Sequence, residues 1–185
     1  MLRKISLITL LSFFSVGLIL GQNEKPQSAE KILNTALKEA KASNKNVFLI
    51  FHASWCSWCK RLEKVLETPE VKKIIEDNYV VARLDVLENE DKAAELENPG
   101  GKNIMVKLGG ENSGLPFYAF LDGNGNKLTN SNVMPKDMNI GYPGSPEELD
   151  AFKSLLQKTS KKITDNDYAL IIDTIKKNLP PPKKS

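Results

Sequence analysis

Cys56 and Cys59 are the only cysteines in the sequence, and they are three residues apart. A structural disulfide stabilises a protein mainly by closing a long loop of the unfolded chain, and a bridge this short restricts that chain very little. Two neighbouring thiols can instead exchange electrons, because one thiolate attacks a disulfide and the second thiol resolves the mixed disulfide that forms. The spacing therefore indicates a redox-active pair rather than a structural crosslink.

The segments around the pair predict different environments for the two sulfurs. Residues 46–51 form a continuous apolar run, typical of a strand buried on both faces, and a helical pattern follows Cys56. Unpaired N–H groups and the positive end of a helix dipole favour a thiolate at such a junction. We expect Cys56 to be the exposed nucleophile, with its thiol pKa lowered from about 8.5 to about 7. Cys59 shares a helical face with Leu62 and Val65, so we expect it to be the shielded, resolving thiol.

The hydrophobic pattern along the rest of the chain predicts alternating helices and strands. Helices are predicted for 28–42, 57–67, a short segment from 69, 91–96, 145–158 and a last amphipathic segment containing Tyr168, Ile171, Ile172 and Ile175. Strands are predicted for 46–51, 79–85, 117–121, 127–129 and 139–142. Glycines punctuate 88–115, which we predict to be a long connection. This order requires an α/β fold, with a central mixed β-sheet and helices on both faces.

The N-terminus differs in composition from the remainder of the chain. Arg3 and Lys4 precede an apolar run of 16 residues, 5–20, which is short for the roughly 20 that span a bilayer. We predict a signal peptide at 1–21 and export, most simply to the periplasm; an uncleaved membrane anchor is the alternative. One domain at 22–160, a C-terminal helix at 161–178 packed on it and a disordered tail at 179–185 complete the predicted organisation.

The charge balance excludes one class of partner. The whole chain carries 26 basic and 23 acidic residues, and the predicted signal peptide contains two of the basic ones. The remaining chain is therefore close to neutral, with four lysines gathered near its C-terminus. Proteins that bind nucleic acids carry a basic patch or stripe, so we expect neither DNA nor RNA as a partner.

The segment from Phe51 to Lys60 carries a family resemblance. A tryptophan directly before the first cysteine and a lysine after the second resemble the active site of the thioredoxin superfamily. The form Trp-Cys-x-Trp-Cys-Lys is most similar to the exported branch, which includes the periplasmic domain of a membrane thiol-disulfide interchange protein. The resemblance extends over about 28–156. It implies a thioredoxin-like fold and a monomeric thiol-disulfide oxidoreductase with no cofactor or metal besides the cysteine pair. The implied partners are protein thiols and disulfides, with a membrane-embedded redox protein among the candidates.

The resemblance also assigns a role to a proline that is distant in sequence. A cis proline faces the cysteine pair in this family, and Pro116, before the apolar run 117–121, occupies the matching place. Such a bond would leave the backbone of Leu115 free to pair with an extended substrate peptide. A trans proline at the start of an edge strand is the alternative.

Two departures from the family leave parts of the mechanism open. Thioredoxins carry a buried acidic residue six positions before the first cysteine, and this position is Ile50 here. Glu63, Lys60 or water could move the proton of Cys59 instead, although Glu63 is more simply a solvated helix residue. The second departure is Trp58, where reducing thioredoxins commonly have proline. Because the residues between the cysteines tune the reduction potential, the direction of electron flow stays open.

Three other side chains near the pair have more than one interpretation. His52, the only histidine, is either a strand-end side chain beside the site or a proton carrier or metal ligand. We expect Trp55 and Trp58 to shield the sulfurs and to form an apolar docking surface, rather than to lie wholly in the core.

Two other classes of function compete with the oxidoreductase. A metal-binding module would use Cys56, Cys59 and His52 for copper(I) or zinc, but a closed zinc site needs four ligands. A client-binding protein would use the fold for recognition, and the 88–115 connection is where such specificity could lie. A tolerated surface insertion explains that connection equally well.

Overall fold

The computed structural model describes residues 25–181. The predicted signal peptide and the last four residues lie outside the described residues. The helices are α1 Ala29–Ser43, α2 Ser57–Leu66, α3 Pro69–Asn78, α4 Glu90–Leu96, α5 Gly101–Lys107, the 3₁₀ turn η1 Pro135–Asp137, α6 Pro146–Thr159 and α7 Asp165–Lys177. The strands are β1 Asn46–His52, β2 Tyr79–Asp85, β3 Phe117–Leu121, β4 Lys127–Asn130, β5 Asn132–Met134 and β6 Met138–Asn139.

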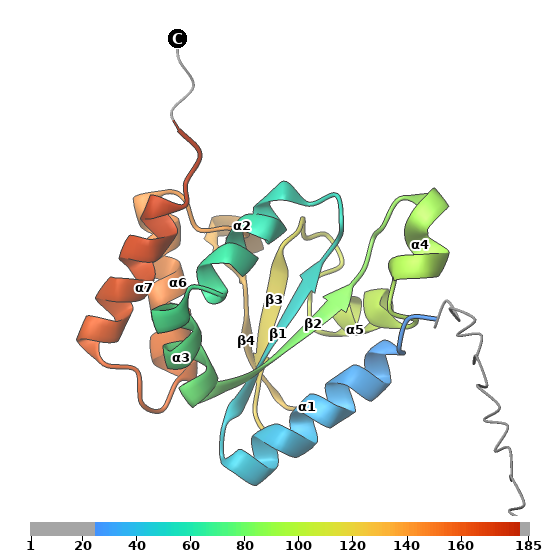
Figure 1. The fold of residues 1–185 in the computed structure, drawn as a ribbon, viewed down its shortest axis with the longest axis horizontal. Helices are drawn as coiled ribbons and strands as arrows, with labels where there is room; N and C mark the ends of the chain where they lie inside the picture. Colours follow the sequence, from blue (N-terminus) through green and yellow to red (C-terminus); the bar gives the residue numbers. More distant parts are fainter. Residues whose placement is uncertain (1–24, 182–185) are drawn as a thin grey trace, which may run out of the picture.

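Four strands form a mixed central sheet in the order β2-β1-β3-β4 (Figure 1). β1 lies in the middle, parallel to β2 and antiparallel to β3, and β4 pairs antiparallel to β3. β5 and β6 form a separate two-stranded sheet. The predicted mixed sheet with helices on both faces is confirmed.

Helices cover the two faces of the sheet with separate apolar cores. α1 and α5 pack on one face, over side chains such as Leu49 and Phe51 of β1. On the other face, α2, α3, α6 and α7 pack over Phe48 and Ile50 of the same strand. Because successive side chains of a strand point to opposite faces, a strand covered on both sides must be apolar throughout. This requirement explains the uninterrupted apolar run that carries the chain into the cysteine pair.

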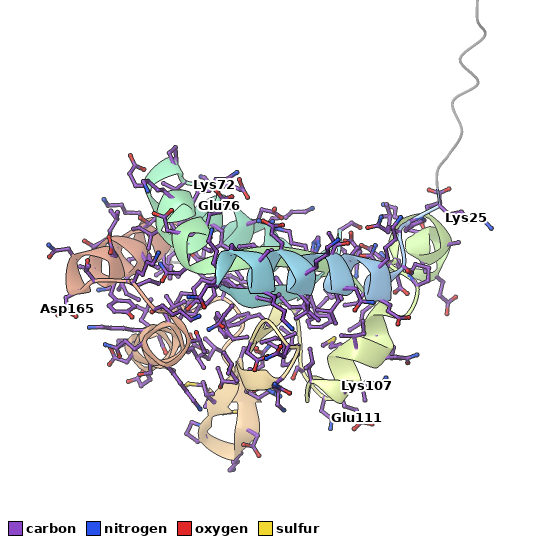
Figure 2. The ribbon with its side chains drawn as sticks, turned by 90° about the horizontal axis from the view of Figure 1, so that it is seen from below. Lys25, Lys72, Glu76, Lys107, Glu111 and Asp165 are labelled. Atoms are coloured by element: carbon purple, nitrogen blue, oxygen red, sulfur yellow. A yellow bond between two sulfur atoms is a disulfide. The ribbon has the colours of Figure 1, made fainter. Side chains whose placement is uncertain are left out.

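The helix starts follow capping chemistry that is legible in the sequence. The hydroxyl of Ser28 accepts a hydrogen bond from the Lys31 N–H at the start of α1. Ser145 and Glu148 form a full capping box at the start of α6. Lys72 and Glu76 lie one turn apart on the outer side of α3 (Figure 2), and their charged groups are 3.8 Å apart. The caps fix where α1 and α6 begin, and none of these contacts touches the cysteine pair.

Three sequence predictions need correction. The 88–115 connection contains α4 and also α5, which the glycine pattern concealed. The strand predicted at 139–142 is β6, which ends at Asn139; Ile140 and Tyr142 are buried in an irregular segment, and burial alone produced their alternating pattern. Leu179 is predicted to lie in a disordered tail, but it packs against the apolar core on the face of the sheet that α2, α3, α6 and α7 cover.

Candidate active site

The cysteine pair lies at the junction between β1 and α2. β1 ends at His52, a turn closes with the Cys56 N–H donating to the Ala53 carbonyl, and α2 begins at Ser57. Cys56 is the N-cap residue of α2, and its Sγ accepts a hydrogen bond from the Cys59 N–H at 3.1 Å. The first turn of α2 carries no acidic side chain. A sulfur in this position receives the positive end of the helix dipole, as the sequence predicted.

Cys56 and Cys59 are joined by a disulfide. Both residues are buried, with 3% and 5% of their surface exposed, so the predicted exposed Cys56 is wrong for this oxidised form. Cys56, Cys59 and Ala53 form one small buried cluster, and the partly buried Leu115 packs against it. The asymmetry that remains is one of position, because Cys56 caps α2 while Cys59 belongs to its buried face together with Leu62.

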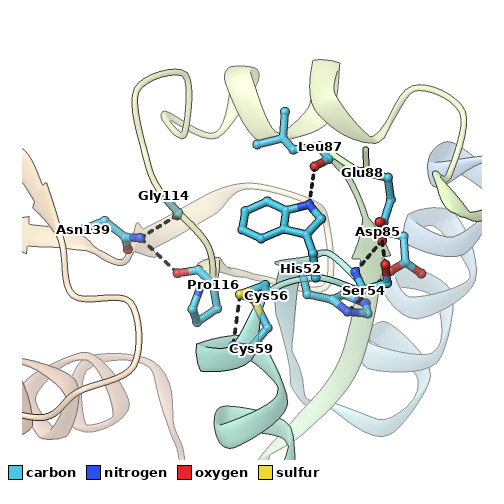
Figure 3. The surroundings of a disulfide bond; sticks show 11 residues. His52, Ser54, Cys56, Cys59, Asp85, Leu87, Glu88, Gly114, Pro116 and Asn139 are labelled. Atoms are coloured by element: carbon cyan, nitrogen blue, oxygen red, sulfur yellow. Dashed lines mark hydrogen bonds and ion pairs between the residues drawn. A yellow bond between two sulfur atoms is a disulfide. The ribbon is translucent and has the colours of Figure 1, made fainter. Parts of the chain in front are cut away.

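The loop opposite the disulfide contains the predicted cis peptide bond between Leu115 and Pro116. The Asn139 side-chain amide donates to the carbonyls on both sides of Leu115, at 2.8 Å to Gly114 and 3.0 Å to Pro116 (Figure 3). Its oxygen accepts from the Gly141 N–H. The backbone of Leu115 itself makes no hydrogen bond within the described residues. Asn139 therefore fixes this loop while the Leu115 backbone stays available.

The two tryptophans lie at the surface beside the disulfide. Trp55 is 50% exposed and Trp58 is 43% exposed, so neither is a core residue. The Trp55 Nε1–H donates to the Leu87 carbonyl at 2.8 Å (Figure 3). The Trp58 ring lies 5.6 Å from that of Tyr142 and 5.7 Å from the Arg61 guanidinium. Both rings are held in place, which suits a preorganised contact surface; their docking role stays a prediction.

A carboxylate fixes the turn before Cys56. Glu88 accepts hydrogen bonds from both the backbone N–H and the hydroxyl of Ser54, the latter at 2.7 Å (Figure 3). The Glu88 N–H in turn donates to the carboxylate of Glu97, the C-cap residue of α4. No local pattern predicts this contact, because Ser54 and Glu88 are 34 residues apart. One part of the 88–115 connection thus supports the site.

A groove of about 840 Å³ opens beside the disulfide. Its walls come from the loop after α5, the β5–β6 hairpin and the segment before α6, and Trp58, Leu115, Met138, Asn139 and Tyr142 are among its lining residues. Lys107 is the last residue of α5, and Glu111 lies in the loop that follows (Figure 2). Met138 is 56% exposed. This groove was not predictable from the sequence patterns, because the β5–β6 hairpin that forms one of its walls was not predicted.

His52 lies at the end of β1, and its Nδ1 is 3.5 Å from the carboxylate of Asp85 on β2 (Figure 3). Burial raises the pKa of Asp85 above its ordinary value, and the nearby Glu88 and Glu63 carboxylates raise it further, while His52 opposes them. Lys60 is exposed on α2, and Ile50 is buried on β1. Among residues 25–181, no three His, Cys, Asp or Glu side chains gather as a metal site.

A model of the thioredoxin-like family matches residues 28–123, just over half of the chain. The chain belongs to the thioredoxin-like family. The match contains β1, the cysteine pair and the Leu115–Pro116 bond, so the fold and the family resemblance are both confirmed. The C-terminal helices α6 and α7 lie outside the matched range.

Curated relatives of this thioredoxin-like chain are thiol-disulfide proteins. It is 31% identical over 102 residues to the thiol:disulfide interchange protein DsbD of Vibrio cholerae, covering 55% of this chain and 15% of that protein. It is 27% identical over 124 residues to the protein disulfide-isomerase of Gallus gallus, covering 62% of this chain and 24% of the relative. The chain thus spans less than a quarter of the length of either relative.

Similar solved structures include a disulphide isomerase from Xylella fastidiosa, with 23% identity, a TM-score of 0.47, and coverage of 55% of this chain and 72% of that one. Another is the DsbH oxidoreductase, with 20% identity, a TM-score of 0.45, and coverage of 82% and 95%. Within residues 25–181, no helix of the thioredoxin-like chain has the length and apolar character needed to cross a membrane.

Proposed function

We propose that this chain is an exported thiol-disulfide oxidoreductase whose cysteine pair exchanges a disulfide with protein substrates or with a redox partner. One observation carries the proposal: the Cys56 sulfur caps α2 and is bonded to Cys59, beneath Leu115. The names of the relatives, a thiol:disulfide interchange protein and a protein disulfide-isomerase, support the same reaction. Export rests on the apolar leader, with periplasmic delivery as its simplest form.

The proposed exchange balances within the two proteins. In the reduced form, the Cys56 thiolate attacks one sulfur of a substrate disulfide, forms a mixed disulfide and releases the first substrate thiolate. Cys59 then loses its proton and attacks the Cys56 sulfur, which breaks the mixed disulfide and releases the second substrate thiolate. Two electrons pass from the protein dithiol to the substrate. The reverse sequence, in which a substrate thiolate attacks Cys56, oxidises the substrate.

The groove supports a protein as the substrate. An extended peptide could pair with the unpaired backbone of Leu115, and its side chains would then meet Trp58 and Met138, which both line the groove. Exposed aromatic and methionine side chains are common at surfaces that bind varied partners. We therefore assign the docking role to Trp55, Trp58, Leu115 and Pro116.

We expect the purified protein to accelerate disulfide exchange in a polypeptide, measured as the reduction of insulin disulfides by dithiothreitol and as the reactivation of a misoxidised ribonuclease. Titration of the cysteine pair in glutathione buffers then gives its reduction potential and so the direction of electron flow. A reduction potential near about −270 mV would indicate a reductant, and one near about −120 mV an oxidant. Rates equal to those without protein in both assays would overturn the proposal.

Asn139→Asp is expected to weaken the use of polypeptide substrates about tenfold in KM, because it removes both donors to the loop carbonyls and places a negative charge beside them. Reaction with a small disulfide such as oxidised glutathione should change little. Steady-state kinetics with both substrates measures this split. Asn132→Asp is the matched control, since it removes a donor to the same loop at the Gly109 carbonyl but keeps an oxygen that can accept from the Ser113 hydroxyl. Equal effects of the two variants would contradict the role of Asn139.

A further inference from the structure

The proposed reaction requires Cys59 to gain and lose a proton although it is 5% exposed. The Ile50 side chain cannot carry that proton. On the side of α2 that faces the sheet, however, Cys59 lines a small cavity of about 10 Å³, together with His52, Glu63, Arg83 and apolar side chains of β1 and α2. This is about the space that one water molecule needs, and the lining offers polar partners for it. The cavity is thus a short route between the Cys59 sulfur and an ionisable side chain.

His52 brings to that lining a ring with two nitrogens, each of which can hold or accept a proton. Its Nδ1 is paired with Asp85 at 3.5 Å, which leaves Nε2 as the second proton site on the ring. The side chains of His52 and Asp85 are 22% and 34% exposed, so the pair also reaches solvent. A proton that enters at the buried sulfur can therefore leave at the surface.

The charged groups around the His52–Asp85 pair come from β2, from α2 and from the segment after β2. Asp85 lies beside His52 on β2, Glu63 on α2 lines the cavity, and Glu88 lies after β2 within electrostatic reach of Asp85. Arg83, also on β2, lines the cavity but is bound to the carboxylates of Glu63 at 3.0 Å and Glu67 at 2.9 Å. The carboxylate of Asp85 is therefore the acidic group paired with His52, while the Glu63 carboxylate in the cavity lining is bound to Arg83.

We propose that His52, held by Asp85, accepts the proton of Cys59 through a water molecule in this cavity and returns it in the reverse reaction. The inference rests on the proposed function. When the mixed disulfide is resolved, the proton moves from the Cys59 sulfur to Nε2 of His52, and the freed electron pair forms the new bond to the Cys56 sulfur. The substrate thiolate leaves and takes a proton from solvent, and the imidazolium loses its proton at the surface.

The raised pKa of Asp85 agrees with a functional role. A carboxyl whose pKa is higher in the folded than in the unfolded chain destabilises the fold once it is ionised, so its contribution worsens as the pH rises from the ordinary value of 3.8 through the folded value. A purely structural ion pair would show the opposite direction. Asp85→Asn is therefore expected to leave thermal stability at neutral pH unchanged or higher while it slows the reaction.

The direct test uses Cys56→Ser, in which Cys59 is the only thiol of the chain. The ultraviolet absorbance of its thiolate is followed against pH, with His52 present and in the double variant with His52→Gln. We expect about tenfold less thiolate near neutral pH after His52→Gln, because the side chain proposed to accept the Cys59 proton is lost. Identical titration curves with and without His52→Gln would overturn the inference. An equal loss of thiolate when Glu63→Gln, in place of His52→Gln, is combined with Cys56→Ser would overturn it as well.

A kinetic test uses the protein with both cysteines. In His52→Gln, reoxidation of the reduced protein by a disulfide substrate should be about 10- to 100-fold slower at neutral pH and should recover as the pH rises, with a smaller effect in Asp85→Asn. An unchanged pH profile in both variants would overturn the proton transfer. An inactive wild-type protein would instead overturn the proposed function, and the titration of Cys59 would still decide whether His52 and Cys59 share a proton.

Discussion

Cys59→Ser is expected to stop turnover and to trap the protein as a mixed disulfide with its substrates. The Cys56 thiolate still attacks, but serine cannot resolve the bond that forms. Cys59 belongs to the buried face of α2. Because Cys56 and Cys59 are the only cysteines of the sequence, no other thiol of this chain can replace it. The covalent adducts are measured on non-reducing gels after reaction with a disulfide-bonded polypeptide, and they should disappear on reduction.

Cys56→Ser is the matched control for this trap. It retains one thiol, and we expect it to form at least about tenfold fewer adducts, since Cys59 lies on the buried face of α2 and does not occupy the capping position that activates Cys56. Adducts in equal yield from both variants would show that the two sulfurs are interchangeable. That result would contradict the assignment of Cys56 as the nucleophile.

Phe48→Ala is expected to destabilise the fold by about 3–5 kcal/mol. The Phe48 side chain is fully buried in the middle of the central strand β1. Its ring stacks on Phe120 with centroids 4.6 Å apart and meets Tyr79 and Tyr118 edge-on at 5.9 and 5.6 Å. Removing the ring leaves a cavity between the sheet and the helices. Denaturant unfolding of the oxidised protein measures the loss as a lower midpoint with an unchanged slope.

Two further variants calibrate that measurement. Phe48→Leu keeps most of the apolar volume and should cost less than Phe48→Ala, while Val133→Ala removes an exposed side chain of β5 and should change stability by less than about 0.5 kcal/mol. If Phe48→Ala cost no more than Val133→Ala, the packing described for this face of the sheet would be wrong.

Local signals in the sequence predicted most of the central sheet and the position of the cysteines. The apolar run of β1 must be buried on both faces, and this condition alone locates it in the middle of the sheet. The caps of α1 and α6 follow from Ser28 and Ser145, each within three residues of its partner. Pro116 was placed by the family resemblance, since nothing in its local sequence fixes the geometry of the bond.

Contacts that join distant segments were not predictable in the same way. α5 begins at Gly101, where any larger residue would place a Cβ 2.7 Å from the Val86 side chain, so the glycine reflects close packing rather than a loop. Asn139 reaches the carbonyls beside Leu115 across more than 20 residues. Such residues carry no periodic or motif signal, and only the folded chain shows that they support the site.

The burial of Cys56 shows a further limit of pattern reasoning. A position at the start of a helix predicts the electrostatic environment of a sulfur but not what lies over it. In the oxidised protein, Leu115 from the opposite loop packs against both cysteines. Under the proposed function, we therefore expect a partner to approach from the side of the groove and the two exposed tryptophans.

The most direct test is the pH dependence of cysteine alkylation in the reduced protein, with the modified residue identified by mass spectrometry. Cys56 should react first, and its rate should reach half of its maximum near about pH 7, because the start of α2 stabilises its thiolate. Equal rates for Cys56 and Cys59, or a half-maximum for Cys56 near about pH 8.5 or above, would contradict the account.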